Sequence, residues 1–155
     1  TYAKMNIGSI ITRVDTPSVL FFLGILMAVA CLQVAGHLTL LAETLDKMGS
    51  FYLTDIFIGA ISSIVDNVPL VAAAMGMYEI APAGPFMVDG PFWEFLAYCA
   101  GTGGSLLIIG SAAGVAVMGM EKIDFVWYLK HISLWALLGY LAGAGTYILM
   151  QTLLF

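Results

Sequence analysis

The stretch "SSIVDNVPLVAAAMGMY" at residues 62–78 sets a carboxylate, an amide and a proline into an otherwise apolar run. These residues are Asp66, Asn67 and Pro69. A proline in a helix interior has no amide hydrogen to donate, and it pushes the preceding residue toward extended geometry. The run is therefore expected to form two short helices, with the polar pair at the break between them.

The composition around this break is that of an integral membrane protein. Of the 155 residues, 61% are hydrophobic and 10% are charged, and the mean hydropathy is +1.00. Soluble domains carry roughly 25% charged residues, so this chain has too few polar groups to cover a soluble surface. The five lysines and arginines are scattered, which argues against nucleic acid as a partner. The lipid bilayer is the expected environment.

The predicted fold is all α, with spanning helices, a re-entrant helical hairpin and a discontinuous helix, in one transmembrane half over residues 1–155. Residues 17–42 are apolar enough and long enough to cross a hydrocarbon core of ~30 Å. The hairpin is expected at 51–80, as helices at about 51–65 and 69–80. The other expected elements are a segment at 1–14 that is either an interfacial helix or a polar connector, a broken helix at 92–121, and a last span at 124–153.

Clustered glycines predict the second interruption. The stretch "GTGGSLLIIGSAAGVAVMG" at residues 101–119 holds two groups of glycines, accompanied by Ser105 and Ser111. An interrupted helix with its gap near residues 109–114 follows from this pattern. The alternative is a continuous helix whose small residues allow close packing against a neighbour.

The basic residues indicate the orientation. If residues 51–80 enter the membrane and return to the same side, Lys47 stands alone on one side and four basic residues share the other. Those four are Lys4, Arg13, Lys122 and Lys130. A single crossing would divide the five residues two against three, which gives no orientation. The positive-inside bias therefore favours a hairpin that opens to the exterior, with a cytoplasmic N-terminus and an external C-terminus.

An acid at membrane depth usually marks the path of an ion or a substrate. Asp66 can hold either a cation or a proton, and the amide of Asn67 offers a carbonyl oxygen. Small hard cations prefer such oxygen ligands. The expected Na⁺/H⁺ site therefore consists of Asp66, Asn67, Ser62, Ser63, Ser105 and Ser111. The alternative is that Asp66 only caps the second short helix.

The cysteines predict no metal site and no disulfide framework. Cys31 and Cys99 stand alone in apolar runs, and both are expected to be buried as small hydrophobic side chains. No cofactor is expected, and Na⁺ and H⁺ are expected as transported ions.

In order and spacing, the 62–78 and 101–119 motifs resemble the second half of NhaD-type sodium/proton antiporters, in the ion transporter superfamily. "DTPSVLFFLGILMAVACLQ" at residues 15–33 is also similar to that family. The resemblance implies an inverted repeat whose hairpin tip and helix break meet in mid-membrane. It also implies that this chain, which begins at Thr1, is the C-terminal repeat of a larger transporter in a bacterial inner membrane. The N-terminal half is then an expected partner, and a second copy of the protein is a candidate one.

Two departures from related carboxylate symporters favour a cation exchanger. Those symporters carry Ser-Asn-Thr at the tip, where this chain has Asp66, Asn67 and Val68. Their helix break reads like Ile-Gly-Thr-Pro-Pro-Asn, whereas residues 109–114 read "IGSAAG" without prolines.

The leading hypothesis is exchange of Na⁺, or Li⁺, for H⁺, with both ions competing for the carboxylate of Asp66. A sodium-coupled anion symporter or metalloid exporter of the same superfamily is the alternative within transport, and a structural membrane subunit is the alternative without a site. An enzyme is not expected, because no HExxH, GxSxG or Cys-His arrangement appears.

Overall fold

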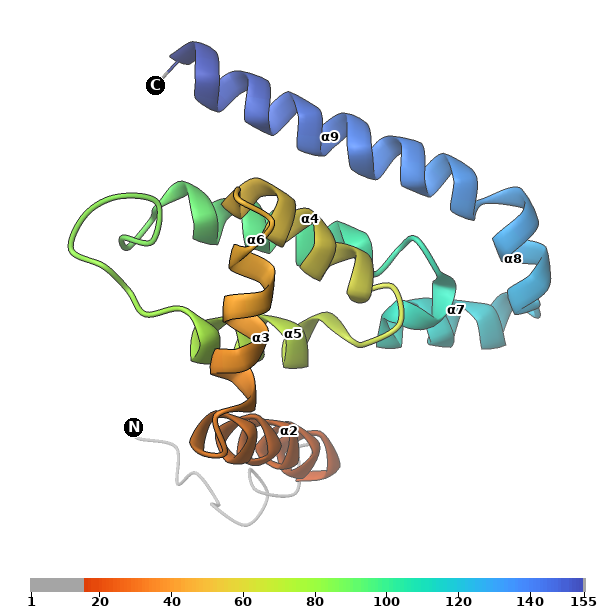
Figure 1. Cartoon of the computed structure of the whole chain (residues 1–155). Helices are drawn as coiled ribbons and strands as arrows, with labels where there is room; N and C mark the ends of the chain where they lie inside the picture. Colours follow the sequence, from red (N-terminus) through yellow and green to blue (C-terminus); the bar gives the residue numbers. More distant parts are fainter. Residues whose placement is uncertain (1–15, 155) are drawn as a thin grey trace, which may run out of the picture.

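The computed structural model describes residues 16–154, which are helical for the most part and form no β-strand (Figure 1). The predicted all-α fold is confirmed for this part of the chain. The expected segment at 1–14 lies outside the described residues. The elements are α2 (Thr16–Val34), α3 (His37–Asp46), α4 (Phe51–Ile61), α5 (Asn67–Met77), α6 (Pro91–Gly103), the 3₁₀ turn η1 (Ile108–Gly110), α7 (Ala112–Glu121), α8 (Phe125–His131) and α9 (Ser133–Leu154).

The expectation of one continuous helix over residues 17–42 is wrong, because the chain bends at Gly36. This residue has a φ of 78°, a left-handed conformation that glycine adopts without the steric cost of a side chain. The two helices meet there at 76°. Among residues 16–154, α9 is long and apolar enough to cross a membrane over Ser133–Leu153, and the bent pair of α2 and α3 passes the same criteria only as one unit.

The hairpin forms as two short helices, but its break lies earlier than predicted. α4 ends at Ile61 and α5 begins at Asn67, so the turn covers residues 62–66. Pro69 is the third residue of α5 rather than the first. The amide groups of a first helical turn have no partner inside the helix, so the missing amide hydrogen of Pro69 costs little there.

The second interruption is confirmed, and the continuous helix is excluded. α6 stops at Gly103, and α7 starts only at Ala112, with η1 between them. The gap therefore begins five residues before the predicted range of 109–114. The last predicted element, 124–153, is two helices, because α8 ends at His131 and α9 starts at Ser133.

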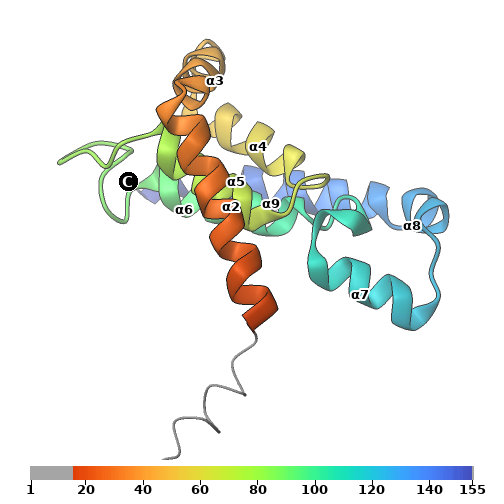
Figure 2. The same cartoon turned by 90° about the horizontal axis from the view of Figure 1, so that it is seen from below.

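The helices pack in layers around α4 and α6, which are the most closely associated pair. α9 lies on one side of this pair, with α5 and then α2 on the other (Figures 1 and 2). Tyr140 of α9 donates its hydroxyl hydrogen to the carbonyl oxygen of Ile56, at 2.9 Å. Cys99 is buried in this core as expected, whereas Cys31 is exposed on α2, which corrects the expectation for that residue.

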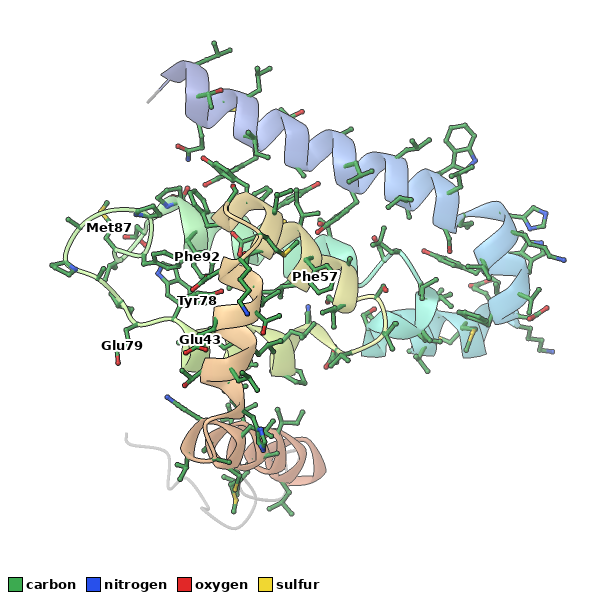
Figure 3. The ribbon with its side chains drawn as sticks, in the orientation of Figure 1. Glu43, Phe57, Tyr78, Glu79, Met87 and Phe92 are labelled. Carbon is green, nitrogen blue, oxygen red and sulfur yellow. The ribbon has the colours of Figure 1, made fainter. Side chains whose placement is uncertain are left out.

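The two ends of the hairpin meet at its base. The hydroxyl of Tyr78, directly after α5, donates to the Asp46 carboxylate at the end of α3, with 3.1 Å between the oxygens. The rings of Tyr78 and Phe92 lie edge to face with their centroids 4.9 Å apart (Figure 3). The chain therefore returns, after α5, to the place from which α4 started.

Candidate functional site

The turn between α4 and α5, here called the hairpin tip (residues 62–66), is attached to α6. Ser62 is fully buried, and its hydroxyl donates to the carbonyl oxygen of Ala100, at 2.8 Å. Ser63 is also buried, and its hydroxyl donates to the carbonyl oxygen of Ala60, at 2.7 Å. Each hydroxyl oxygen keeps lone pairs that can accept a hydrogen bond or coordinate a cation.

The tip meets the helix break, which is the segment 104–111 between α6 and α7, at Gly110. A Cβ atom on this residue would lie 2.5, 2.6 and 2.7 Å from the carbonyl oxygens of Ser62, Ser63 and Gly104, respectively, so only glycine fits. Both views place the tip beside the start of α7 (Figures 1 and 2). Three backbone carbonyls from the ends of α4 and α6 thus converge on one point of the break.

These three carbonyl oxygens have unused lone pairs. Within residues 16–154 other than Ala112, none of them accepts a hydrogen bond from another group. The ends of interrupted helices provide such carbonyls to cations in secondary transporters. Nor do three His, Cys, Asp or Glu side chains gather into a metal site in this part of the chain. The ligands that the break offers to a cation are therefore backbone carbonyl oxygens and hydroxyl oxygens.

Asp66 ends the tip and caps α5. One oxygen of its carboxylate accepts from the backbone amide of Asn67, at 3.1 Å, and both side chains are half-buried. The capping role considered from the sequence is thus present. It uses one carboxylate oxygen and leaves the other without a hydrogen bond from residues 16–154. No hydrogen bond joins Asp66 or Asn67 to the break in the same range.

The two serines of the break differ in position. Ser111 follows Gly110, is half-buried, and caps α7 by accepting from the amide of Gly114, at 3.0 Å. Ser105 is exposed, and its hydroxyl donates to the carbonyl oxygen of Thr102, at 2.6 Å. Of the predicted site residues, Ser62, Ser63 and Ser111 come together around Gly110. Asp66 ends the tip and Asn67 follows it. Among the described residues, no hydrogen bond joins the Ser105 hydroxyl to the tip.

The prediction from sequence missed Asp55. This residue lies in α4, is 0% exposed, and has no hydrogen-bond partner for either carboxyl oxygen among the described residues. An isolated acid within an apolar segment indicates an ion or substrate path, and Asp55 fits this pattern as Asp66 does. Unlike Asp66, Asp55 does not lie at a helix break, so the sequence pointed to it less clearly.

Comparison with known proteins finds that the chain is similar to transporters. The family model described as "Citrate transporter" matches residues 2–93. "Sodium/proton antiporter 1" of Arabidopsis thaliana is 49% identical over 153 residues, which are 98% of this chain and 26% of the relative. "Na(+)/H(+) antiporter NhaD" of Alkalimonas amylolytica is 34% identical, covering 97% of this chain and 30% of the relative. "Na(+)/H(+) antiporter NhaD" of Halomonas elongata is 37% identical, covering 91% and 27%.

This chain spans between a quarter and a third of the length of these curated relatives. No solved structure matches it significantly.

Proposed function

Because the chain belongs to the citrate transporter family, we propose that it is part of a secondary transporter that exchanges Na⁺, or Li⁺, for H⁺ across a membrane. The observation that carries this proposal is the convergence of three unpaired backbone carbonyls at Gly110, where the hairpin tip meets the helix break. Relatives that bear the name sodium/proton antiporter support the same choice of ions.

The chemistry of the site follows from its oxygens. The carbonyl oxygens of Ser62, Ser63 and Gly104, with the hydroxyl of Ser111, offer hard ligands to a small cation. Asp66 supplies the charge. Its uncapped oxygen binds either the cation or a proton, and because the two compete for one carboxylate, their fluxes are coupled without covalent chemistry.

Asp66→Asn tests this role. The amide keeps the shape of the side chain and an oxygen that caps α5, but it removes the charge and the titration. We expect loss of Na⁺-driven proton movement in vesicles that contain the full-length protein, and partial activity with altered Na⁺ affinity for Asp66→Glu. In the wild type, apparent Na⁺ affinity should fall as the pH falls, because protons displace the cation from the same carboxylate.

Asp89→Asn is the matched control, since Asp89 is an exposed carboxylate in the loop before α6. Its φ of 55° is a conformation that asparagine tolerates. Exchange at the wild-type rate by Asp66→Asn would show that Asp66 is only a helix cap.

A carboxylate symporter remains the second candidate, because the matching family model is described as a citrate transporter. Basic side chains in the apolar segments would be needed to bind an organic anion, but the sole arginine of this chain is Arg13. Sodium-dependent citrate uptake by the same vesicles would favour the symporter.

The membrane arrangement completes the proposal. The first turn of α2 faces the cytoplasm, the hairpin opens to the exterior, and the C-terminal end of α9 is external, in the plasma membrane of a bacterium or the corresponding membrane of a related organism. The remaining part of the longer transporter supplies the other side of the site, and a second copy is the candidate for an oligomer.

A further inference from the structure

A carboxyl group that the proposed exchange does not use lies two turns from the tip, on the face of α4 that packs against α6. This face is buried along its whole length and consists of Thr54, Asp55, Ile58, Gly59 and Ser62. Asp55 is 0% exposed, and neither of its oxygens has a hydrogen-bond partner in the part of the chain that the structure describes. No other carboxyl group in residues 16–154 combines full burial with the lack of a partner.

Helices of this same chain enclose the carboxyl group. One turn beyond it, a Cβ on Gly59 would lie 2.5 Å from the carbonyl oxygen of Cys99, so the backbones of α4 and α6 are in contact. On the side of α9, the Tyr140 hydroxyl is held by the carbonyl oxygen of Ile56. Residues elsewhere in a longer protein therefore cannot reach Asp55 while α4 and α6 are packed in this way.

The surroundings do not compensate a negative charge. Titratable side chains that feel the charge of Asp55 include Tyr78 after α5, Cys99 on α6 and Tyr140 on α9, and none of these three is basic. Tyr78 in turn donates a hydrogen bond to the carboxylate of Asp46 on α3, which is also an acid and cannot serve as a counterion. A buried carboxylate without a counterion or hydrogen bond is far more costly than the neutral acid.

We propose that Asp55 is a second proton-binding site, separate from Asp66, that keeps its proton while α4 is packed on α6 and releases it when this packing opens. On release, the O–H bond of the carboxyl group breaks, the proton passes to water, and a carboxylate remains. Thr54, the neighbour of Asp55 in the sequence, lines a cavity of about 380 Å³ at the base of the hairpin together with Tyr78 and Phe92 among others, and we expect the released proton to leave through it.

Infrared spectroscopy of the purified full-length protein at neutral pH tests the protonation directly. The difference spectrum between wild type and Asp55→Asn should contain the C=O stretch of a protonated carboxyl group. If the difference instead contains the stretches of an ionised carboxylate, the proposal is overturned. Asp89→Asn is the matched control and should remove only carboxylate signals, because Asp89 is exposed.

Asp55→Leu is a second variant, to be used if the Asp55→Asn protein does not fold because its buried amide has no hydrogen-bond partner. Leucine branches at the same carbon as aspartic acid, carries methyl groups in place of the two oxygens, and has no polar group to leave unpaired. We expect it to fold with a thermal midpoint at or above that of the wild type and to lack the same protonated-carboxyl signal. A signal that persists in Asp55→Leu would assign the proton to another residue.

A role of Asp55 in transport rests on the proposed Na⁺/H⁺ exchange, and a separate measurement tests it. Loss of one titrating group should make the pH dependence of Na⁺-driven proton movement less steep in Asp55→Leu than in the wild type. An unchanged profile, together with a protonated Asp55, would overturn its participation in exchange. Failure of the Asp66 exchange hypothesis would appear separately, in the Asp66→Asn variant, and would leave the infrared result standing.

Discussion

The side chain of Ser111 has two connected functions at the residue scale. It caps α7 through Gly114, and it directly follows the glycine on which the carbonyls of the tip converge. Its extended backbone, with φ −144° and ψ 145°, suits a cap and also suits a β-branched residue. Replacing the hydroxyl is therefore expected to affect the stability of α7 and to remove one oxygen ligand of the proposed cation site.

Ser111→Ala should weaken apparent Na⁺ affinity by roughly 1–3 kcal/mol, the cost of losing a partly buried hydrogen bond or ligand. Ser111→Thr should restore it, because threonine keeps the hydroxyl. Na⁺ titration of exchange in vesicles measures both.

Ser133→Ala is the control for this prediction, since the Ser133 hydroxyl is buried without a partner among residues 16–154 and has no bond to lose. Equal effects of Ser111→Ala and Ser133→Ala on affinity would remove Ser111 from the site.

At the scale of elements, the contact between the hairpin and the broken helix depends on the absence of a side chain at Gly110. The three oxygens around it belong to the backbone, which cannot rotate away as a flexible side chain can. The hydrogen bond from Ser62 to Ala100 fixes the same contact from the other side. The tip and the break are thus positioned as one unit.

Gly110→Ala should separate this unit and destabilise the protein by about 1–3 kcal/mol, the usual cost of overpacking a close contact. We expect a lower thermal midpoint of the purified protein and a loss of Na⁺ affinity.

Gly101→Ala is the matched substitution, because a Cβ there meets nothing within 4 Å. It should be neutral or stabilise α6 by roughly 0.5–1 kcal/mol, since alanine is the better helix former. A Gly110→Ala protein as stable and active as Gly101→Ala would contradict the close contact described here.

At the scale of the whole molecule, the return of the chain at the base of the hairpin determines which loops share a side. The bond between Tyr78 and Asp46 closes the hairpin at the end opposite its tip. The loops that precede α4 and follow α5 then leave from the same end. A hairpin of this form can enter a membrane and come back without crossing it.

Lys47→Cys and Asp89→Cys should accordingly react with an impermeant thiol reagent from the same side of the membrane. The measurement requires a background in which Cys31 and Cys99 are replaced by serine. Lys122→Cys, in the turn between α7 and α8, should react from the opposite side. Labelling of positions 47 and 89 from different sides would show that residues 51–80 cross the membrane.

Features that depend on composition and on neighbouring residues could be predicted from the sequence. The scarcity of charge indicated a membrane protein, and Pro69 and the glycines of 101–119 indicated two interrupted helical segments. Boundaries were less well predicted, because Pro69 is tolerated in a first turn and Gly36 bends a segment that composition alone describes as continuous.

Which polar groups meet, and which remain without a partner, depends on the packing of helices that are distant in the sequence. Ser62 bonds to Ala100, which lies 38 residues away in the sequence, and its carbonyl oxygen reaches Gly110 because α4 rests on α6. Asp55 and Asp66 look alike as acids in apolar runs, yet one is enclosed without a partner and the other caps a helix at the tip. Burial and contact depend on how distant helices pack, and neither composition nor local spacing contains that information.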